Sequence, residues 1–405
     1  MEKLPQEGKK IQQHPDASNE QVDFRLCLVL SHLQGPIGYS IFTFDSSDSR
    51  VVVHGNQLPK LTPLIELPSE VYPKGSGVFV VGSRVYLVGG EIEARPKRSG
   101  KPLVLTNSVY VIDTAAPISL GDVMQHSTHM NGGKSMSTVD YVNGLVYVLS
   151  GLPTFNAYFD KKNVFFESFD PNTDEWSPLP NPPFFDFKGG RARIDSHVVV
   201  GSTIVYRSYA FGYVYVFHLE TNKWEIIEMS REQWALLPFR NEFVLLKDAV
   251  WASIGVYALS TYCLVPELGF VQRQVDSLGM LVPPCPQLQC MVGHILLRLN
   301  NDWFCMVAFG HDGDSDIGGK PFIRASVFRL VQTREDEFSL CEAFPWPPHR
   351  TSPSAATTVP KPGKKPRKAV REVPVFGAVD IFSILFDVDV KHFNEWSALA
   401  GCFLL

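Results

Sequence analysis

The chain has 405 residues, of which 45% are hydrophobic and 20% charged, the balance of an ordinary soluble protein with a large core. A formal net charge of −5 argues against a surface that coats nucleic acid, and no apolar run is long enough to cross a bilayer without a charge. The 30 Gly and 30 Pro predict many short strands joined by turns.

The beginning of the chain differs from the rest. Residues 1–22 are polar from the start and lack periodic apolar positions, so we predict a disordered head and no secretory signal. The chain has seven Cys and no Cys-x-x-Cys pair. We therefore expect reduced, mostly buried thiols in an intracellular, cytoplasmic protein.

Residues 23–348 read as a series of short β units. The best preserved unit runs from Val139 to Trp176, and its hairpin turns at Val142–Asn143–Gly144, where Asn and Gly adopt positive φ at little cost. Irregular spacing between the units fits repeats that keep their strands and vary their loops. The hairpin centre recurs at Val85–Tyr86, Val146–Tyr147, Val205–Tyr206, Val250–Trp251 and Phe304–Cys305.

Two further segments follow the repeats. Residues 349–372 are rich in Pro, Ser and Thr and then basic, which is typical of a flexible linker. The Lys and Arg residues within 361–371 are either a solvated spacer or a nuclear-import signal, which would place the protein in the nucleus as well. Residues 373–405 are apolar again and form either a closing strand or a short helix, since periodicity does not decide between them.

These units predict an all-β fold. One four-stranded unit cannot cover both of its faces, but units packed around an axis bury both faces against their neighbours. We therefore expect a β-propeller of four-stranded blades with six blades, or seven if the C-terminal segment adds one.

The repeat resembles a known family. An apolar hairpin that ends in Gly or Gly–Gly, an aromatic third strand and a Trp that opens the fourth strand resemble the kelch repeat, in the degenerate form common in plant proteins of the galactose oxidase/kelch superfamily. No F-box is found before the repeats. Glycine allows close backbone approach near the axis, and the large aromatics fill space between blades. The residues expected to build the fold in this way are Gly89, Gly90, Tyr147, Gly151, Trp176 and Trp224.

The resemblance implies a non-catalytic module that binds a protein partner, such as the substrate of a ubiquitin ligase. Loops on one face of the predicted propeller combine Arg with aromatic residues, the types that anchor protein interfaces. We expect no membrane or nucleic-acid partner and make no prediction of oligomeric state. The predicted partner-binding residues are Arg95, Arg98, Phe155, Tyr158, Arg191, Arg193, Arg207 and Tyr209.

Motifs for chemistry are weak. In residues 311–319 the aspartates alternate as in a calcium loop, but the required Gly is displaced to Gly318 and Ile323 stands where a bidentate Glu belongs. His126 and His129 have no third ligand nearby. We find no nucleophile elbow and no phosphate loop, so we expect no enzymatic activity, metal or cofactor. The alternative is a propeller enzyme with a metal or acid/base site at the axis.

Overall fold

The structure, a computed structural model, describes the chain in segments whose regular secondary structure is almost entirely β-strand. Two short 3-10 helices are present among them, η1 (Leu120–Asp122) and η2 (Pro183–Asp186), and no helix in these segments is long and apolar enough to span a membrane. The prediction of an all-β fold is confirmed. The described residues are 23–46, 60–93, 103–115, 119–151, 163–186, 194–208, 212–229, 243–247, 250–254, 259–265, 269–274, 290–300, 302–311, 321–338, 343–344, 371–388 and 397–405.

The strands form four sheets of four strands, two of five and one of two. The four-stranded sheets, written in spatial order, are β28 (Ser397–Leu404), β1 (Arg25–His32), β2 (Ile37–Asp45), β4 (Ile65–Pro68); β10 (Met124–Gln125), β9 (Val109–Asp113), β6 (Arg84–Val88), β5 (Gly77–Val81); β11 (Thr138–Val142), β12 (Leu145–Leu149), β13 (Phe166–Asp170), β14 (Glu175–Pro178); and β15 (Ile194–Val200), β16 (Thr203–Ser208), β17 (Tyr213–His218), β18 (Lys223–Glu228).

Of the remaining three sheets, two have five strands and one has two. They are, in spatial order, β19 (Phe243–Lys247), β20 (Val250–Ile254), β21 (Leu259–Val265), β22 (Gly269–Gln274), β26 (Ala343–Phe344); β23 (Cys290–Arg298), β24 (Trp303–His311), β25 (Pro321–Phe338), β27 (Arg371–Val388), β3 (Lys60–Leu61); and the hairpin β7 (Glu91–Glu93), β8 (Leu103–Leu105).

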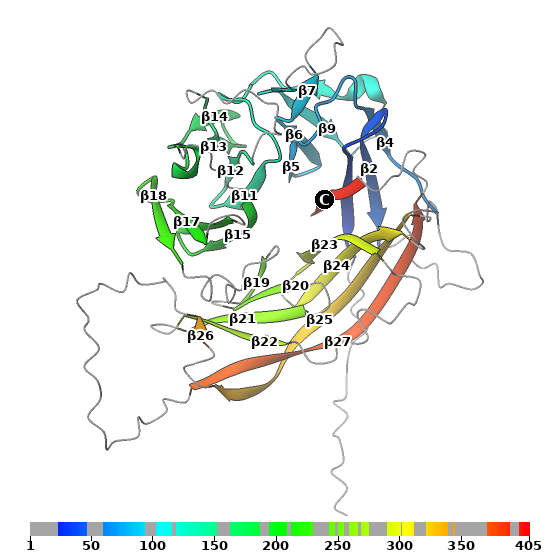
Figure 1. The fold of residues 1–405 in the computed structure, drawn as a ribbon. Helices are drawn as coiled ribbons and strands as arrows, with labels where there is room; N and C mark the ends of the chain where they lie inside the picture. Colours follow the sequence, from blue (N-terminus) through cyan, green and yellow to red (C-terminus); the bar gives the residue numbers. More distant parts are fainter. Residues whose placement is uncertain are drawn as a thin grey trace, which may run out of the picture.

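The large sheets follow one another around a common axis (Figure 1). Within each of these sheets, neighbouring strands that follow one another in the chain pair antiparallel, as in the run β11-β12-β13-β14. This arrangement confirms a β-propeller of four-stranded blades.

The turn predicted at Val142–Asn143–Gly144 is present. Val142 pairs with Leu145 across a two-residue loop in which Asn143 has φ 53° and Gly144 φ 83°. Both values lie in the left-handed region that a tight hairpin requires, which explains Asn and Gly at these positions.

The last strand closes the fold. β28 pairs antiparallel with β1, bringing Cys402 opposite Leu28 and Leu404 opposite Leu26. β27 pairs with β25 instead, so the predicted C-terminal segment contributes strands to two sheets. The described parts of 373–405 are strand, and residues 397–404 pair with β1.

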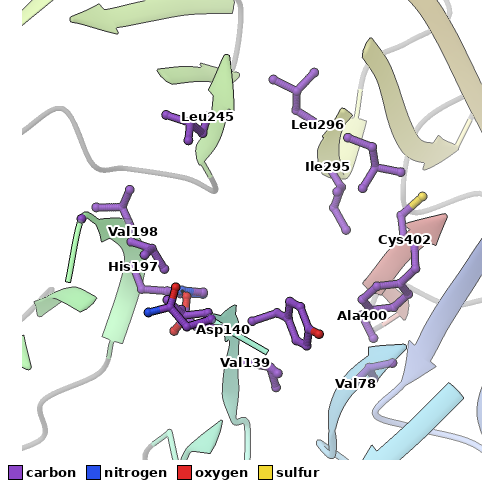
Figure 2. Close-up of a pocket in the computed structure, with 17 residues that line it drawn as sticks. Val78, Val139, Asp140, His197, Val198, Leu245, Ile295, Leu296, Ala400 and Cys402 are labelled. Atoms are coloured by element: carbon purple, nitrogen blue, oxygen red, sulfur yellow. Dashed lines mark hydrogen bonds and ion pairs between the residues drawn. The ribbon is translucent and has the colours of Figure 1, made fainter. Parts of the chain in front are cut away.

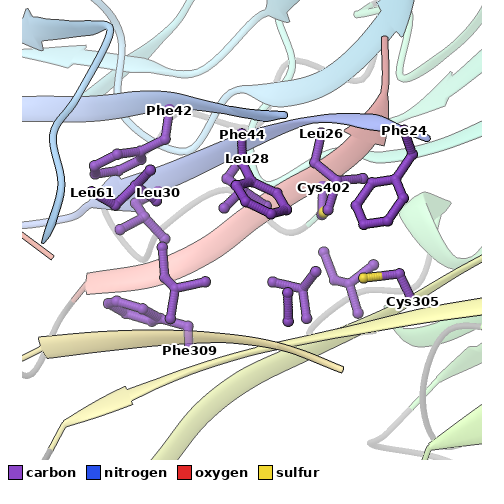
Figure 3. Packing of buried hydrophobic residues seen from close by; sticks show 14 of the residues in the cluster. Phe24, Leu26, Leu28, Leu30, Phe42, Phe44, Leu61, Cys305, Phe309 and Cys402 are labelled. Carbon is purple, nitrogen blue, oxygen red and sulfur yellow. The ribbon is translucent and has the colours of Figure 1, made fainter. Parts of the chain in front are cut away.

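A hydrophobic cluster joins this closed sheet to the neighbouring sheet of β24 and β25 (Figure 3). Leu28 and Cys402 from one side pack with Cys305 and Phe309 from the other, and all four are at most 3% exposed. Full burial of a large aliphatic or aromatic side chain stabilises a fold by about 1.5–3 kcal/mol. β1 and β28 therefore share one core with β24 and β25.

Three of the seven cysteines, Cys27, Cys305 and Cys402, are buried and form no disulfide. Burial raises the pKa of the Cys27 and Cys305 thiols to about 12, so almost no reactive thiolate forms at neutral pH. We expect these three thiols to resist maleimide in the native protein and to react after denaturation, as measured by peptide mass spectrometry. Labelling of Cys305 in the native state at the denatured rate would contradict this packing.

The residues predicted to build the repeat lie in tight contacts. A Cβ added to Gly89 would lie 2.6 Å from the Lys134 carbonyl oxygen, and one added to Gly151 would lie 2.3 Å from that of Met136. The Trp224 indole donates a hydrogen bond of 2.7 Å to the Pro180 carbonyl at the end of the preceding sheet. Tyr147 is buried, the ring of Trp176 lies 4.8 Å from that of Phe169, and Gly90 has φ 101° against Pro73.

Candidate functional site

Most of the predicted partner-binding residues lie outside the described part of the chain: Arg95, Arg98, Phe155, Tyr158, Arg191, Arg193 and Tyr209. Arg207 is described by the structure. The prediction that it lies on an exposed loop is wrong. β16 extends to Ser208, so Arg207 pairs with Ser196 and Val214 inside the sheet and is only 3% exposed.

The sequence motifs weighed for metal binding gain no support. His126 bonds to Thr128 through Nδ1 (2.8 Å) and to Asp174 through Nε2 (3.3 Å), so both ring nitrogens have protein partners. Within the described residues no group of three or more His, Cys, Asp and Glu is placed to hold a metal ion. Asp312, Asp314 and Asp316 of the other motif lie outside the described residues.

The β7–β8 hairpin projects from the sheet that contains β6 and β9 (Figure 1). Its base is held on both sides by backbone bridges, since Glu91 pairs with Lys74 and Thr106 pairs with Lys134. The Ser135 hydroxyl also donates to the buried Glu91 carboxylate. The hairpin therefore stands on a rigid base rather than on a loose loop.

The hairpin exposes apolar side chains. Ile92 and Val104 are directly opposed across the two strands and are 42% and 46% exposed. We call Ile92 and Val104 the hairpin patch.

A buried ion pair anchors the segment that supports this patch. Glu167 and Lys134 are both 0% exposed, and the Lys134 ammonium donates to the Glu167 carboxylate, to the Val164 carbonyl (2.9 Å) and to the Gly132 carbonyl (3.3 Å). The same carboxylate accepts the Asn131 backbone N–H (2.7 Å), the Asn131 side-chain amide (2.6 Å) and the Gly132 backbone N–H (3.0 Å). Residues 131–134 are therefore folded around one carboxylate.

Burial and charge oppose each other at Lys134. Desolvation lowers the pKa of Lys134 from 10.5 to about 8, and the neighbouring Glu167 carboxylate acts against that shift by favouring the ammonium form. Both the Lys134 ammonium and the Glu167 carboxylate make several further hydrogen bonds, and a buried ion pair is tolerated under that condition.

A cavity of about 730 Å³ lies where the end strands of the large sheets converge. We call it the axial cavity (Figure 2). Each of β5, β11, β15, β19, β23 and β28 contributes lining side chains, represented by Val78, Asp140, His197, Leu245, Ile295 and Ala400.

The charged side chains of the cavity wall are concentrated at one place. Asp140 Oδ1 lies 2.7 Å from His197 Nδ1, and the buried Tyr206 hydroxyl donates to Asp140 Oδ2 at 3.2 Å. Because a carboxylate only accepts, Nδ1 carries the proton that is shared with Asp140. We call Asp140, His197 and Tyr206 the polar pole.

Tyr206 stays protonated in this arrangement. Burial, and then the adjacent Asp140 charge, raise the pKa of Tyr206 well above 10. The phenol therefore acts as a fixed donor to Asp140 rather than as an acid at neutral pH. The polar pole fixes the orientation of the His197 imidazole in the cavity wall.

Neither the Lys134–Glu167 ion pair nor the polar pole was predicted from the sequence. Asp140 and His197 occupy the first strands of two successive repeats, at Val139–Asp140–Tyr141 and His197–Val198, so a polar residue among apolar ones on a first strand was the available signal. Glu167 likewise interrupts the apolar third strand that begins at Phe166.

These features define the class as a β-propeller protein with an axial cavity and a projecting hairpin. The chain belongs to the family described as Protein of unknown function (DUF1668), whose model matches residues 12–343.

Similarity to individual proteins is more distant. The F-box/kelch-repeat protein At4g39590 of Arabidopsis thaliana is 24% identical over 145 residues, which cover 35% of this chain and 34% of that protein. The chain thus matches about a third of the length of that relative. Among solved structures, YjhT is 14% identical with a TM-score of 0.40 and covers 76% of this chain and 95% of that chain. Hsv2 of Kluyveromyces lactis is 9% identical with a TM-score of 0.29, covering 76% and 90%.

Proposed function

We propose that this propeller is a non-catalytic protein-interaction module whose partner docks on the hairpin patch. The observation that carries the proposal is the exposed cross-strand pair Ile92 and Val104 on a base held by the Lys74 and Lys134 bridges. A rigid apolar contact loses little conformational entropy on binding, which favours its use as an anchor.

The partner we propose carries acidic groups around an apolar contact. The chain between β7 and β8 contains Arg95, Lys97, Arg98 and Lys101. Basic residues in the connection between two strands of an apolar anchor favour an acidic partner by charge complementarity. Arg95 and Arg98, which the sequence predicts as partner-binding, fall in this stretch.

The similarity to an F-box/kelch-repeat protein supports one setting for such a module, the recognition of substrates in a ubiquitin ligase or a similar assembly. We propose plant-type kelch repeats and a cytoplasmic protein, with nuclear import through residues 361–371 as the alternative. We also propose six blades, supported by the six sheet-end strands that line the axial cavity.

We expect Ile92→Asp and Val104→Asp, made separately, to weaken partner capture at least tenfold, because each places a charge in the apolar anchor next to an acidic partner. Partners are identified by affinity purification and mass spectrometry of the tagged wild-type chain, and affinities are then measured with the purified partner. Met124→Asp is the matched control, since Met124 is 66% exposed on the edge strand β10 of the sheet from which the hairpin projects.

Melting temperatures of all three variants should stay within a few degrees of the wild type, since exposed positions are altered. Equal capture by the hairpin variants and the control, or no protein enriched with the wild type, would show that the hairpin patch is not the docking site.

A further inference from the structure

The backbone of the innermost strands gives the axial cavity a polar surface of its own. β5, β11, β15, β19, β23 and β28 each lie at one end of a sheet, so each has an edge without a neighbouring strand among the described residues. Because all six strands contribute lining residues, those edges face the cavity. An edge without a neighbour presents backbone N–H and C=O groups that need partners. The wall therefore combines polar backbone groups with apolar side chains.

The hydrogen bonds of β12 show which backbone groups of β11 are used inside the sheet. The Ser150 backbone N–H donates to the Phe165 carbonyl at 2.8 Å, on the side of β13. Because bonding alternates along an antiparallel strand, Val148 also bonds to β13, and its neighbour Tyr147 bonds to β11. Tyr147 pairs with Asp140, so the backbone groups of Asp140 are bonded within the sheet.

The two neighbours of Asp140 direct their backbone groups the other way, toward the axis. They are Val139 and Tyr141, and both line the axial cavity. In the described part of the chain, neither has a backbone hydrogen bond outside the β11–β12 ladder. Val199 of β15 lies one residue before the strand end at its own two-residue turn, as Tyr141 does in β11, and it lines the cavity too. The two strands therefore agree on which groups face the cavity.

These groups repeat at the spacing of a strand. Val139 and Tyr141 are two residues apart, which on an extended strand places their outward N–H and C=O groups about 6.6–6.8 Å from each other. Each residue offers a donor and an acceptor side by side, the arrangement that one residue of an antiparallel strand matches. An extended peptide repeats these pairs at the same distance, whereas a carbohydrate does not.

The side chains around β11 restrict which peptide fits. Tyr141, 66% exposed, and Leu245, 45% exposed, line the cavity and are open to solvent, so a chain can enter beside them. Leu245 and Ile295 supply apolar surface from two other sheets (Figure 2). Asp140 and His197 are the acidic and basic residues of the lining, and no Lys or Arg is among the described residues that form it. An acidic peptide is therefore disfavoured by charge.

We propose that the axial cavity binds a short extended peptide without acidic side chains, which adds to the cavity-facing edge of β11 as a fifth strand of that sheet. The peptide backbone exchanges hydrogen bonds with Val139 and Tyr141, and its side chains contact the apolar part of the wall. The hairpin patch lies on β7 and β8, so the two sites are tested independently.

The test uses acetylated and amidated pentapeptides on the purified full-length chain, with affinity measured by saturation-transfer NMR titration. The reference peptide is Val-Lys-Val-Lys-Val. Two versions carry one N-methyl group, either on the central Val or on the second Lys, and a further version has Glu in place of both Lys. Because alternate N–H groups of a strand face its neighbour, we expect only one of the two N-methyl versions to bind about fivefold more weakly, the factor for one net hydrogen bond. The Glu version should bind more weakly than the reference.

Two variants of one residue locate the peptide. Tyr141→Pro removes the N–H that faces the cavity and keeps the ladder to β12, a position where an edge strand tolerates proline. Tyr141→Ala removes the same ring and keeps the N–H. We expect Tyr141→Pro to bind the reference peptide about fivefold more weakly than Tyr141→Ala does. If Tyr141→Pro fails to fold, Val139→Pro and Val139→Ala make the same comparison at the other outward residue.

Each other outcome overturns the proposal. Absence of binding by the reference peptide, or equal affinity for the two N-methyl versions, excludes strand addition. Equal affinity of the Pro and Ala variants excludes the edge of β11 as the site. Binding of the Glu version as tight as that of the reference excludes selection against acidic peptides. Maltotriose serves as a carbohydrate probe, and tighter binding of maltotriose than of the reference peptide would assign the cavity to a carbohydrate instead.

Discussion

Replacing Glu167 by Gln is expected to lower the free energy of unfolding by about 3–5 kcal/mol, the usual cost of removing one partner from a buried ion pair. The variant leaves the Lys134 ammonium, 0% exposed, without its counter-charge. It also weakens three further hydrogen bonds that hold residues 131 and 132 against β13. The measurement is urea unfolding followed by intrinsic fluorescence at pH 7.

The loss of stability in Glu167→Gln should depend on pH in a defined direction. In the wild type the pKa of Lys134 is about 8 when folded and 10.5 in its ordinary state, so the unfolded chain binds more protons between these values and stability rises with pH there. Glu167→Gln removes the charge that supports the ammonium, so the folded pKa falls below 8 and this window widens downward. The difference in stability between wild type and variant should therefore be larger at pH 6 than at pH 9.

Glu175→Gln is the matched control. Glu175 lies on β14, the neighbouring strand of the same sheet, and is exposed, so its substitution should change stability by no more than about 0.5 kcal/mol. A Glu167→Gln variant as stable as this control would show that the buried pair does not hold the segment from Asn131 to Lys134.

The repeat and its fold class could be predicted because their signals are local. Alternating apolar residues and the Asn143–Gly144 turn specify a hairpin within a dozen residues, and four-stranded units of this kind have few ways to cover both faces. The position of β28 was harder to predict. Its pairing partner, β1, lies at the other end of the chain, and an apolar stretch suits a strand or a buried helix equally well.

The polar clusters could not be predicted in the same way. Lys134 and Glu167 are 33 residues apart in the chain, and Asp140 and His197 are 57 apart and lie on adjacent sheets. Such pairs meet only in the folded chain, and a charged residue read alone is expected at the surface. Arg207 illustrates the opposite error. The sequence predicts that it lies on an exposed loop, but β16 continues for two residues beyond Tyr206 and takes Arg207 into the sheet.

A substitution in β28, the closing strand, should also cause a large loss of stability. Cys402→Asp places a charge in the cluster of Leu26, Leu28 and Cys305, where Cys402 is 3% exposed. An unpaired charge in such a site should lower the free energy of unfolding by on the order of 4 kcal/mol. Leu404→Asp, two residues further along the same strand and 36% exposed, should cost less than about 1 kcal/mol.

Comparing Cys402→Asp with Leu404→Asp tests whether β28 closes the first sheet, because both variants alter that strand. If β28 completes the first sheet, Cys402→Asp releases it and leaves β1 with an unpaired edge, which favours aggregation on heating. Light scattering during thermal unfolding, read beside circular dichroism, should then show earlier aggregation for Cys402→Asp alone. Equal melting temperatures for the two variants would mean that residues 397–404 do not pack into the core. In that case the two ends of the chain would not be held together by β28.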